Sequence, residues 1–400
     1  MIRLALILML LAGGALAQGF GVAARVDAAG SRIADEGKGV AMTLALSQGV
    51  PWRVFTLDAP PRLVLDAQEV DWTGLDPAAL LQTSRITSVR FGAYVPGWSR
   101  LVAELAAPLV IDRASLATQE DGATLDVFLI PAKAEEFAAA SGAPSDPRWD
   151  LPPPVPVQKR DERRPDAPVV VVIDPGHGGI DPGAEAPGTD EKSLMLTFAR
   201  ELREALLRGG GFEVVLTRDD DVFVSLERRI AIAHEAGADV FISLHADSLS
   251  EGLAHGATVH VLSAEASDVA SEKLAERHDR DDLLSGVDLT EADDEVTGVL
   301  LSLARQETQP RTEALAHALV QGMAQTGGPM NRRPLRAAGF SVLKAADIPS
   351  VLIEIGFLTS PRDLRNLRDA RWRAGMARGI RNGLANWAAS DAAKRPLVRR

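Results

Sequence analysis

The sequence contains no cysteine, which excludes disulfide bonds, cysteine-based metal sites and thiol redox chemistry. It also contains no histidine before His177 and no H-E-x-x-H pattern, in which one helix carries two metal-binding histidines. A metal site would therefore have to be built from histidines and carboxylates that are distant in the sequence. The phosphate-binding patterns G-x-x-x-x-G-K-[ST] and G-x-G-x-x-G are absent too, and this disfavours a nucleotide site.

Basic residues are in the minority. The 43 lysines and arginines are outnumbered by 55 acidic residues, and the formal net charge is -12 at pH 7. Because nucleic-acid binding requires a basic surface, we expect no nucleic acid among the partners. With 400 residues, 46% of them hydrophobic, the chain is long enough for about two to three domains with substantial cores.

The hydrophobic segment at the N-terminus is too short for a membrane-spanning helix. Its apolar core covers residues 4–11, whereas a spanning helix needs about 20 apolar residues. Arg3 precedes this core, and the sequence A-L-A at residues 15–17 follows it as a small-x-small cleavage site. We interpret residues 1–17 as a signal peptide for the general secretory route, with a membrane anchor as the alternative.

The rest of the chain divides into three parts. Residues 24–130 form short apolar segments broken by proline, glycine and aspartate, which predicts a small antiparallel β module. Residues 131–168 are rich in proline and charge, which predicts an extended linker. Residues 169–390 alternate strand and helix patterns, which predicts an α/β domain with a twisted, mostly parallel sheet flanked by helices. The candidate strands of this domain are residues 169–173, 213–217, 239–244, 257–261, 340–344 and 350–355.

Four polar side chains are predicted to meet at one edge of this sheet. His177 follows the first strand in VVVVIDPGHGG, His245 follows DVFISL, and Glu354 lies within SVLIEI. Glu191, in GTDEKSL at the start of a helix, is a fourth oxygen donor. Ligand-binding groups of an α/β sheet collect at the C-terminal ends of its strands. Two histidines and a carboxylate with one open coordination position are a known set of catalytic zinc ligands.

Each of these residues also has a purely structural interpretation. His177 could brace a glycine-rich turn, Glu191 could be an ordinary acid in the first turn of a helix, and His245 could be a hydrogen-bonded residue at a strand end. Glu354 lies between two isoleucines, and because an unpaired buried carboxylate is costly we expect a cation opposite it. The remaining histidines have no comparable context, and we expect surface or packing roles for them. They are His234, His255, His260, His278 and His317.

Five sequence blocks, taken together, resemble the zinc-dependent N-acetylmuramoyl-L-alanine amidases of bacterial cell-wall turnover (the amidase_3 family). The blocks are IDPGHGGIDPGA, EKSL, VVLTRDDDVFVSLERRIAIA, FISLHAD and IPSVLIEIGFLTS, and they occur in order through most of residues 169–390. In that family the histidine of GHGG, the glutamate of the EK pair and the histidine of the second strand-end block bind zinc. The resemblance therefore implies that His177, Glu191 and His245 are zinc ligands and that Glu354 is catalytic.

The same resemblance implies a reaction. The bond cleaved joins the lactyl group of N-acetylmuramic acid to the L-alanine of the stem peptide. Zinc lowers the pKa of a bound water toward about 7, and Glu354 would take the proton of that water and return it to the leaving amine. The sequence departs from the commonest pattern of the family at Asp247 and at His234, where asparagine is frequent, but neither is a ligand position.

Two further regions resemble parts of the division-associated AmiC/AmiB type of this family. Residues 24–130, most clearly in PWRVFTLDAPPRLVLD, are similar to the AMIN module, a small β-sandwich-like domain associated with binding peptidoglycan at the division site. Residues 264–310 add an acidic stretch and an amphipathic helix, and are similar to an insertion that covers the zinc until a LytM-type activator (EnvC/NlpD-like) moves it. Glu295 is our candidate for a carboxylate that blocks the zinc, and Glu291 is the second. An ordinary solvated acidic helix is the alternative.

These observations predict a periplasmic, monomeric amidase that cleaves peptidoglycan at the septum and separates daughter cells. Its expected cofactor is Zn2+, its expected partners are peptidoglycan and the activator, and no membrane span is expected after signal cleavage. Two alternatives remain open. One is a zinc peptidase or carboxypeptidase acting within the stem peptide, because the ligand set alone does not exclude it. The other is a non-catalytic wall-binding protein.

Overall fold

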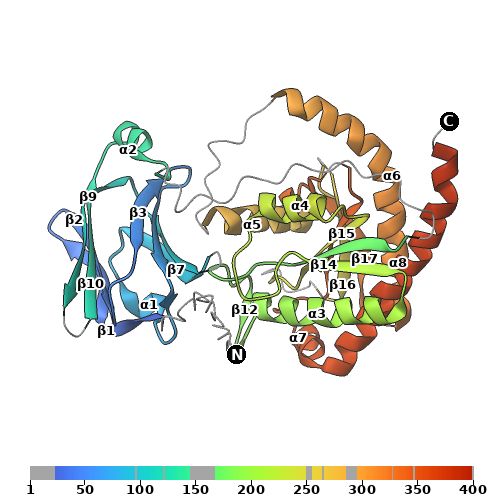
Figure 1. Cartoon of the computed structure of the whole chain (residues 1–400), viewed down its shortest axis with the longest axis horizontal. Coiled ribbons are helices and arrows are strands. Elements are labelled where there is room, and N and C mark those ends of the chain that lie inside the picture. Colours follow the sequence, from blue (N-terminus) through green and yellow to red (C-terminus); the bar gives the residue numbers. More distant parts are fainter. Residues whose placement is uncertain are drawn as a thin grey trace, which may run out of the picture.

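The computed structural model describes most of the chain as two bodies that lie side by side (Figure 1). The described residues are 23–94, 97–119, 122–144, 167–248, 255–263, 265–284, 295–326, 328–345 and 347–398. The signal peptide predicted at residues 1–17 and the second blocking candidate, Glu291, lie outside these ranges. A β-sandwich precedes an α/β body, which is the fold class predicted from the sequence.

The β-sandwich consists of two sheets around one core. The first sheet has the order β5-β1-β2-β10-β9 with β6 beside β1, and the second has the order β3-β4-β8-β7. Alternation gives each strand one inward face: Val40, Met42 and Leu44 of β2 are buried, whereas the residues between them are partly exposed. The elements are β1 (Ala24–Glu36), β2 (Gly39–Leu46), β3 (Trp52–Leu57), β4 (Arg62–Gln68), β5 (Val70–Asp71), α1 (Pro77–Leu80), β6 (Leu81–Gln82), β7 (Ile86–Ala93), β8 (Trp98–Leu105), β9 (Leu109–Gln119), β10 (Gly122–Pro131) and α2 (Ala134–Ala140).

The α/β body is built on a six-stranded sheet with the order β14-β11-β15-β18-β16-β17. All neighbouring pairs are parallel except β16 with β18. β11 and β15 lie centrally and are covered on both faces, which explains their unbroken apolar sequences. The strands are β11 (Val169–Pro175), β14 (Phe212–Leu216), β15 (Val240–His245), β16 (Ala257–Leu262), β17 (Met330–Ala338) and β18 (Ser350–Glu354), with a separate hairpin of β12 (Glu185–Ala186) and β13 (Thr189–Asp190).

Helices cover both faces of this sheet and create two cores. The larger core joins one sheet face to α3, α6 and α8, and the smaller joins the other face to α4, α5 and the short 3-10 helix η1. The helices are α3 (Glu191–Gly209), α4 (Leu226–Glu235), α5 (Val269–Leu284), α6 (Glu295–Thr326), η1 (Ser341–Leu343), α7 (Pro361–Arg368) and α8 (Ala370–Val398). Within the described residues no helix is both long and apolar enough to cross a membrane.

The sheet differs from the prediction at two places. Residues 340–344 were expected as a strand but contain η1, because a short apolar run can bury its side chains equally well as a single helical turn. The sheet instead gains β17, whose sequence MNRRPLRAA lacks a strand pattern. β17 is an edge strand, and proline is tolerated at an edge because its missing N–H removes no essential ladder bond.

The segment predicted as an insertion, residues 264–310, contributes α5 and the first half of α6. α6 runs past residue 310 without a break, and its second half is part of the larger core through Leu315, Leu319 and Met323. α5 packs on the opposite face of the sheet through Leu274 and neighbouring apolar residues. The insertion is therefore attached to both faces of the six-stranded sheet.

Candidate active site

The C-terminal ends of three adjacent parallel strands carry the residues singled out in the sequence. β11 leads into the loop that bears His177, β15 ends at His245, and β18 ends at Glu354. His245 and Glu354 are direct partners in the register of β15 and β18. The shared edge of the sheet thus brings together side chains that are 68 to 177 residues apart in the sequence.

Glu191 joins them from the N-terminus of α3. Asp190 caps this helix by accepting a hydrogen bond from the backbone of Ser193 at 2.9 Å, and the next residue, Glu191, is fully buried. Its Oε1 lies 3.3 Å from Nε2 of His177 and 3.2 Å from Nδ1 of His245. Backbone N–H groups of Ala184 and Ala246 donate to the two carboxylate oxygens. Glu191 is therefore not an ordinary solvent-exposed acid in the first turn of α3.

The loop after β11 holds His177 in an unusual conformation. Its φ is +59°, which is rare for a residue other than glycine. Nδ1 of the ring lies 2.7 Å from Oδ2 of Asp181, and Arg229 donates to the His177 carbonyl oxygen at 2.9 Å. A hydrogen bond between a carboxylate and one ring nitrogen fixes the orientation of the whole ring. The contact of Nδ1 with Asp181 therefore directs Nε2 toward Glu191.

The charges of these groups reinforce one another. Burial disfavours a charged ring, but the carboxylates of Asp181 and Glu191 outweigh it and raise the pKa of His177 well above its ordinary range. Burial likewise works against an ionised Glu191, but His177 and the hydrogen bond from His245 hold the pKa of Glu191 well below its ordinary range. Burial and the neighbouring His278 lower the pKa of His245 to about 4. Glu191 is therefore an anion placed between two imidazoles.

Glu354 is also fully buried. Its Oε2 accepts a hydrogen bond from the backbone N–H of Asp247 at 3.0 Å, and its Oε1 has no hydrogen-bond partner among the residues that the structure describes. Burial, together with the carboxylates of Glu191 and Asp247, raises the pKa of Glu354 well above its ordinary range. Nε2 of His278 lies 3.9 Å from Oε1 of Glu354. The expectation that a cation faces this carboxylate stays a prediction.

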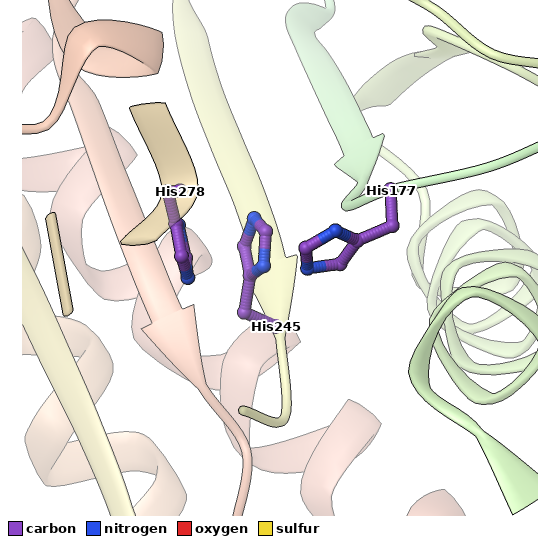
Figure 2. Close-up of side chains that lie close together, drawn as sticks. All are labelled: His177, His245 and His278. Atoms are coloured by element: carbon purple, nitrogen blue, oxygen red, sulfur yellow. The ribbon is translucent and has the colours of Figure 1, made fainter. Parts of the chain in front are cut away.

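His278 is the site residue that the sequence analysis missed. Figure 2 shows its ring beside those of His177 and His245, and it is carried by α5 of the insertion. The rings of His245 and His278 lie 4.2 Å apart, and His177, His245 and His278 each offer a nitrogen within 4.8 Å of the others. His278 was expected in a surface or packing role; it is buried, and its ring also packs against Phe340. Its position in a charged helix carried no signal, because only the docking of α5 brings it to the site.

Other expected residues lie elsewhere. His260 is buried against Phe340, and His234 pairs with Asp347 at 2.8 Å, which agrees with packing and surface roles. Glu295, the first blocking candidate, begins α6, and its side chain is not among the described parts of the chain. Neither Glu295 nor Glu291 is therefore placed at the site by the described residues.

The donor set suits a metal ion. Within the described residues, four buried polar atoms at the site lack a hydrogen-bond partner, and all belong to groups that bind metals. They are Nε2 of His177, Nε2 of His278, Oε1 of Glu354 and Oδ2 of Asp247. Buried polar atoms without partners are rare, so such a cluster points to an ion that satisfies them. Imidazole and carboxylate ligands without cysteine are typical of zinc and of other first-row divalent metals.

Comparisons with known proteins agree on one family. A family model described as N-acetylmuramoyl-L-alanine amidase (Amidase_3) matches residues 171–386. The chain is 30% identical over 373 residues to the amidase AmiC of Neisseria meningitidis serogroup B, with 88% of each chain covered. It is 28% identical over 366 residues to the amidase AmiC of Escherichia coli O6:H1, with 88% of this chain and 87% of that protein covered.

A solved structure, the amidase AmiC2 of Nostoc punctiforme, is 26% identical to this chain, with a TM-score of 0.41 and coverage of 55% of this chain and 97% of that one. The family model covers more than half of the 400 residues, and the relative from Neisseria meningitidis matches along nearly the whole chain. The chain belongs to the N-acetylmuramoyl-L-alanine amidase family and is an enzyme of that class.

Proposed function

We propose that this enzyme is a zinc amidase that hydrolyses the bond between N-acetylmuramic acid and L-alanine in peptidoglycan, with His177, Glu191 and His245 as the zinc ligands. The observation that carries the proposal is the position of Oε1 of Glu191, within 3.3 Å of His177 Nε2 and 3.2 Å of His245 Nδ1. Glu191 thus lies against both histidines, which supports a site in which each of the three residues supplies one ligand to a catalytic zinc.

The chemistry of the reaction divides between the metal and Glu354. When bound, zinc supplies a water molecule acidified toward a pKa of about 7 and a Lewis acid for the scissile carbonyl group. Glu354 accepts the proton of the attacking water at Oε1, its atom without a hydrogen-bond partner, and delivers it to the leaving nitrogen. Burial raises the pKa of Glu354, as is common for carboxylates that act as general acids and bases. The backbone N–H of Asp247 holds the other oxygen, Oε2, in place.

The competing activity is a zinc peptidase or carboxypeptidase that cuts within the stem peptide. Mass spectrometry of peptidoglycan digested by the purified enzyme separates the two. Intact stem peptides released from unbroken glycan chains are expected for the amidase, whereas shortened peptides still attached to muramic acid would overturn the proposal. Family membership and the complete set of buried site residues disfavour the other alternative, a non-catalytic wall-binding protein.

We also propose that the insertion inhibits the enzyme, and that His278 of α5 takes part in the block. The cavity lined by His177, His245 and His278 has a volume of only about 20 Å3, enough for roughly one water molecule and far too small for a sugar-linked peptide. Arg277 of the same helix donates to Oδ1 of Asp247 at 2.7 Å, which fastens α5 over the site. Access for the substrate requires α5 to move.

A deletion within the insertion tests this block. Removing the whole of residues 264–310 would cut into the part of α6 where Thr308 is buried, so a shorter deletion that ends before residue 308 is preferable. Hydrolysis of purified sacculi without partner proteins is expected to rise. Unchanged hydrolysis would count against autoinhibition, and parallel Glu295→Gln and Glu291→Gln variants determine whether a carboxylate of the insertion contributes.

The cellular role is proposed on the same basis. Residues 24–130 would act as an AMIN-type module that binds peptidoglycan and directs the enzyme to the division septum, after export to the periplasm by the signal peptide at residues 1–17. A LytM-type activator would displace the insertion. Support comes from the similarity to proteins named AmiC along almost the whole chain. A fluorescent fusion that labels the cell periphery uniformly, or cells that lack the gene and still separate normally, would contradict this role.

A further inference from the structure

The loop that carries His177 is in direct contact with the N-terminal β-sandwich. The carbonyl oxygen of Ala93, the last residue of β7, accepts a hydrogen bond from the backbone N–H of Ile180 at 2.9 Å. A Cβ atom on Gly179 would lie 1.9 Å from that carbonyl oxygen, and one on Gly92 would lie 3.0 Å from the Gly179 backbone. The two bodies therefore meet backbone to backbone, with a glycine on each side. In Figure 1 the contact lies beside β7.

Apolar side chains from both bodies surround this contact. Ile180 and Phe223 of the α/β body share one cluster with four sandwich residues, and they are only 2% and 4% exposed. Tyr94 stacks on Phe223 with a ring separation of 5.6 Å. Arg100 in turn lies over the Tyr94 ring at 3.6 Å. The sandwich residues of the cluster are Phe55, Leu57, Val64 and Val102. The contact thus buries large apolar groups of both bodies, as a specific interface does.

The same loop connects this contact to His177. Asp181 follows Ile180, and its Oδ2 lies 2.7 Å from Nδ1 of His177. Paired backbone hydrogen bonds between Gly178 and Asp181 close the loop tightly. Arg90 of β7 approaches Oδ1 of Asp181 to 3.9 Å from the sandwich side. Anchoring Ile180 therefore places the carboxylate that orients the His177 ring.

His177 needs such support. Its φ of +59° is an unfavourable backbone conformation for a side-chain-bearing residue, and such conformations persist only where surrounding contacts enforce them. Some of those contacts come from the α/β body itself, through Arg229, and the rest come from the sandwich. The position of His177 therefore depends on both bodies.

We propose that the β-sandwich is a structural part of the metal site: docked through Ala93 and Tyr94, it holds Ile180 and Asp181 and so positions His177 to bind the metal. Arg90, Ala93 and Ile180 act through other residues and are positioning groups. The inference rests on the proposed role of His177 as a zinc ligand. It predicts that separation of the sandwich from the α/β body weakens zinc binding.

The full-length chain offers a clean probe of docking, because Tyr94 is its only tyrosine. Incorporation of 3-fluorotyrosine gives one 19F resonance, whose chemical shift reports the stacking on Phe223. Gly92→Val serves as a wedge, since it adds atoms where the Gly179 backbone lies and changes nothing in the α/β body. Thr87→Val, on an exposed position of the same strand, is the matched control.

Three measurements are made on each variant: the 19F shift, the zinc affinity in competition with a chromophoric chelator, and the visible spectrum of the cobalt(II) form. For Gly92→Val we expect a shifted 19F resonance, a zinc affinity about tenfold lower and an altered cobalt spectrum, because loss of a partner of a metal ligand typically costs that much. Thr87→Val should match the wild type in all three. Arg90→Gln should weaken zinc binding in the same direction, and Arg90→Lys should restore it.

The outcomes separate this inference from the proposed function. If Gly92→Val undocks the sandwich while zinc affinity and the cobalt spectrum stay as in the wild type, the inference is overturned and the zinc amidase proposal stands. If the 19F resonance of the wild type already matches that of Gly92→Val, the sandwich is not docked and the inference also fails. If the wild type binds no zinc, the proposed function itself fails. Should Gly92→Val not fold, the Arg90 pair of variants decides.

Discussion

The imidazole rings of His245 and His278 lie 4.2 Å apart with an angle of 30° between their planes, although one is at a strand end and the other on an inserted helix. His278 is 6% exposed, and its Nε2 has no hydrogen-bond partner within the described part of the chain. An imidazole from α5 therefore occupies space next to the predicted zinc ligands. The first prediction follows from this contact.

We expect His278→Ala to raise the hydrolysis of purified sacculi without an activator by about tenfold or more, because each factor of ten corresponds to about 1.4 kcal/mol of lost helix docking. Release of dye from labelled sacculi measures the rate. His317→Ala, an exposed histidine on α6, should leave the rate unchanged. A loss of activity as complete as that of His177→Ala would show instead that His278 is a required ligand.

Asp247 is expected to fasten α5. Its Oδ1 accepts from Arg277 at 2.7 Å, and its Oδ2 lies 3.6 Å from Nε2 of His278. Asp247→Asn and Arg277→Gln should each raise the unassisted rate, and the double variant should exceed neither by much, since both remove the same pair. The rates of the four proteins form a double-mutant cycle. Fully additive effects on the free energy would contradict a direct coupling of the two residues.

Glu354→Gln separates catalysis from metal binding. The substitution preserves the shape of the side chain but removes its ability to take a proton, so the rate should fall by roughly 100- to 10,000-fold. Zinc content, measured by elemental analysis, should remain close to one per chain, whereas His245→Ala should lose both zinc and activity. Substantial activity in Glu354→Gln would exclude the proposed role of this residue.

Zinc removal should affect stability as well as activity. An ion held by His177, Glu191 and His245 binds the folded chain preferentially, and at a hundredfold excess over its Kd such an ion stabilises by about 2.7 kcal/mol. Treatment with a chelator should therefore abolish hydrolysis and lower the unfolding temperature, and added zinc should reverse both. Hydrolysis that continues in excess chelator would exclude the zinc mechanism.

Asp174 is expected to be a stabilising residue beneath the site. It is fully buried and accepts hydrogen bonds from Arg229, Thr217 and Ser243. Asp174→Asn leaves the Arg229 guanidinium buried without its counter-ion, which should cost about 3–5 kcal/mol in the free energy of unfolding. Arg228→Gln, which breaks a partly exposed pair with Glu235, should cost no more than about 1 kcal/mol. Urea unfolding of both variants provides the comparison.

Asp174 also predicts an acid dependence. Burial would raise the pKa of Asp174, but Arg229 and the two hydroxyl groups outweigh burial and hold that pKa below its ordinary value of 3.8. Because the folded chain binds this proton less readily than the unfolded chain, the stabilisation is complete above pH 3.8 and is lost as the pH falls through the folded pKa. The unfolding free energy of Asp174→Asn should accordingly fall less steeply below pH 4 than that of the wild type.

The sequence by itself determined the layout of the catalytic edge. Apolar strands followed by polar residues predicted that His177, His245 and Glu354 would meet, because parallel strands end at a common edge, and the structure brings them together with Glu191. The local sequence pattern was less informative where a strand and a helical turn would bury the same side chains. The apolar side chains of residues 340–344 could be buried in a strand or in a helical turn, and only packing selected the turn.

Only the tertiary structure decided which distant segments close over the site. His278 lies in a charged helix whose sequence is compatible with a solvated surface, and it reaches the site because α5 docks through Leu274 and the Arg277–Asp247 pair. The contact of Ala93 with Ile180 likewise depends on two bodies whose surfaces match without any shared sequence pattern. The periodicity of apolar residues predicts which face of a helix or strand is buried. Which segment covers that face depends on the shapes and charges of the two folded surfaces that meet.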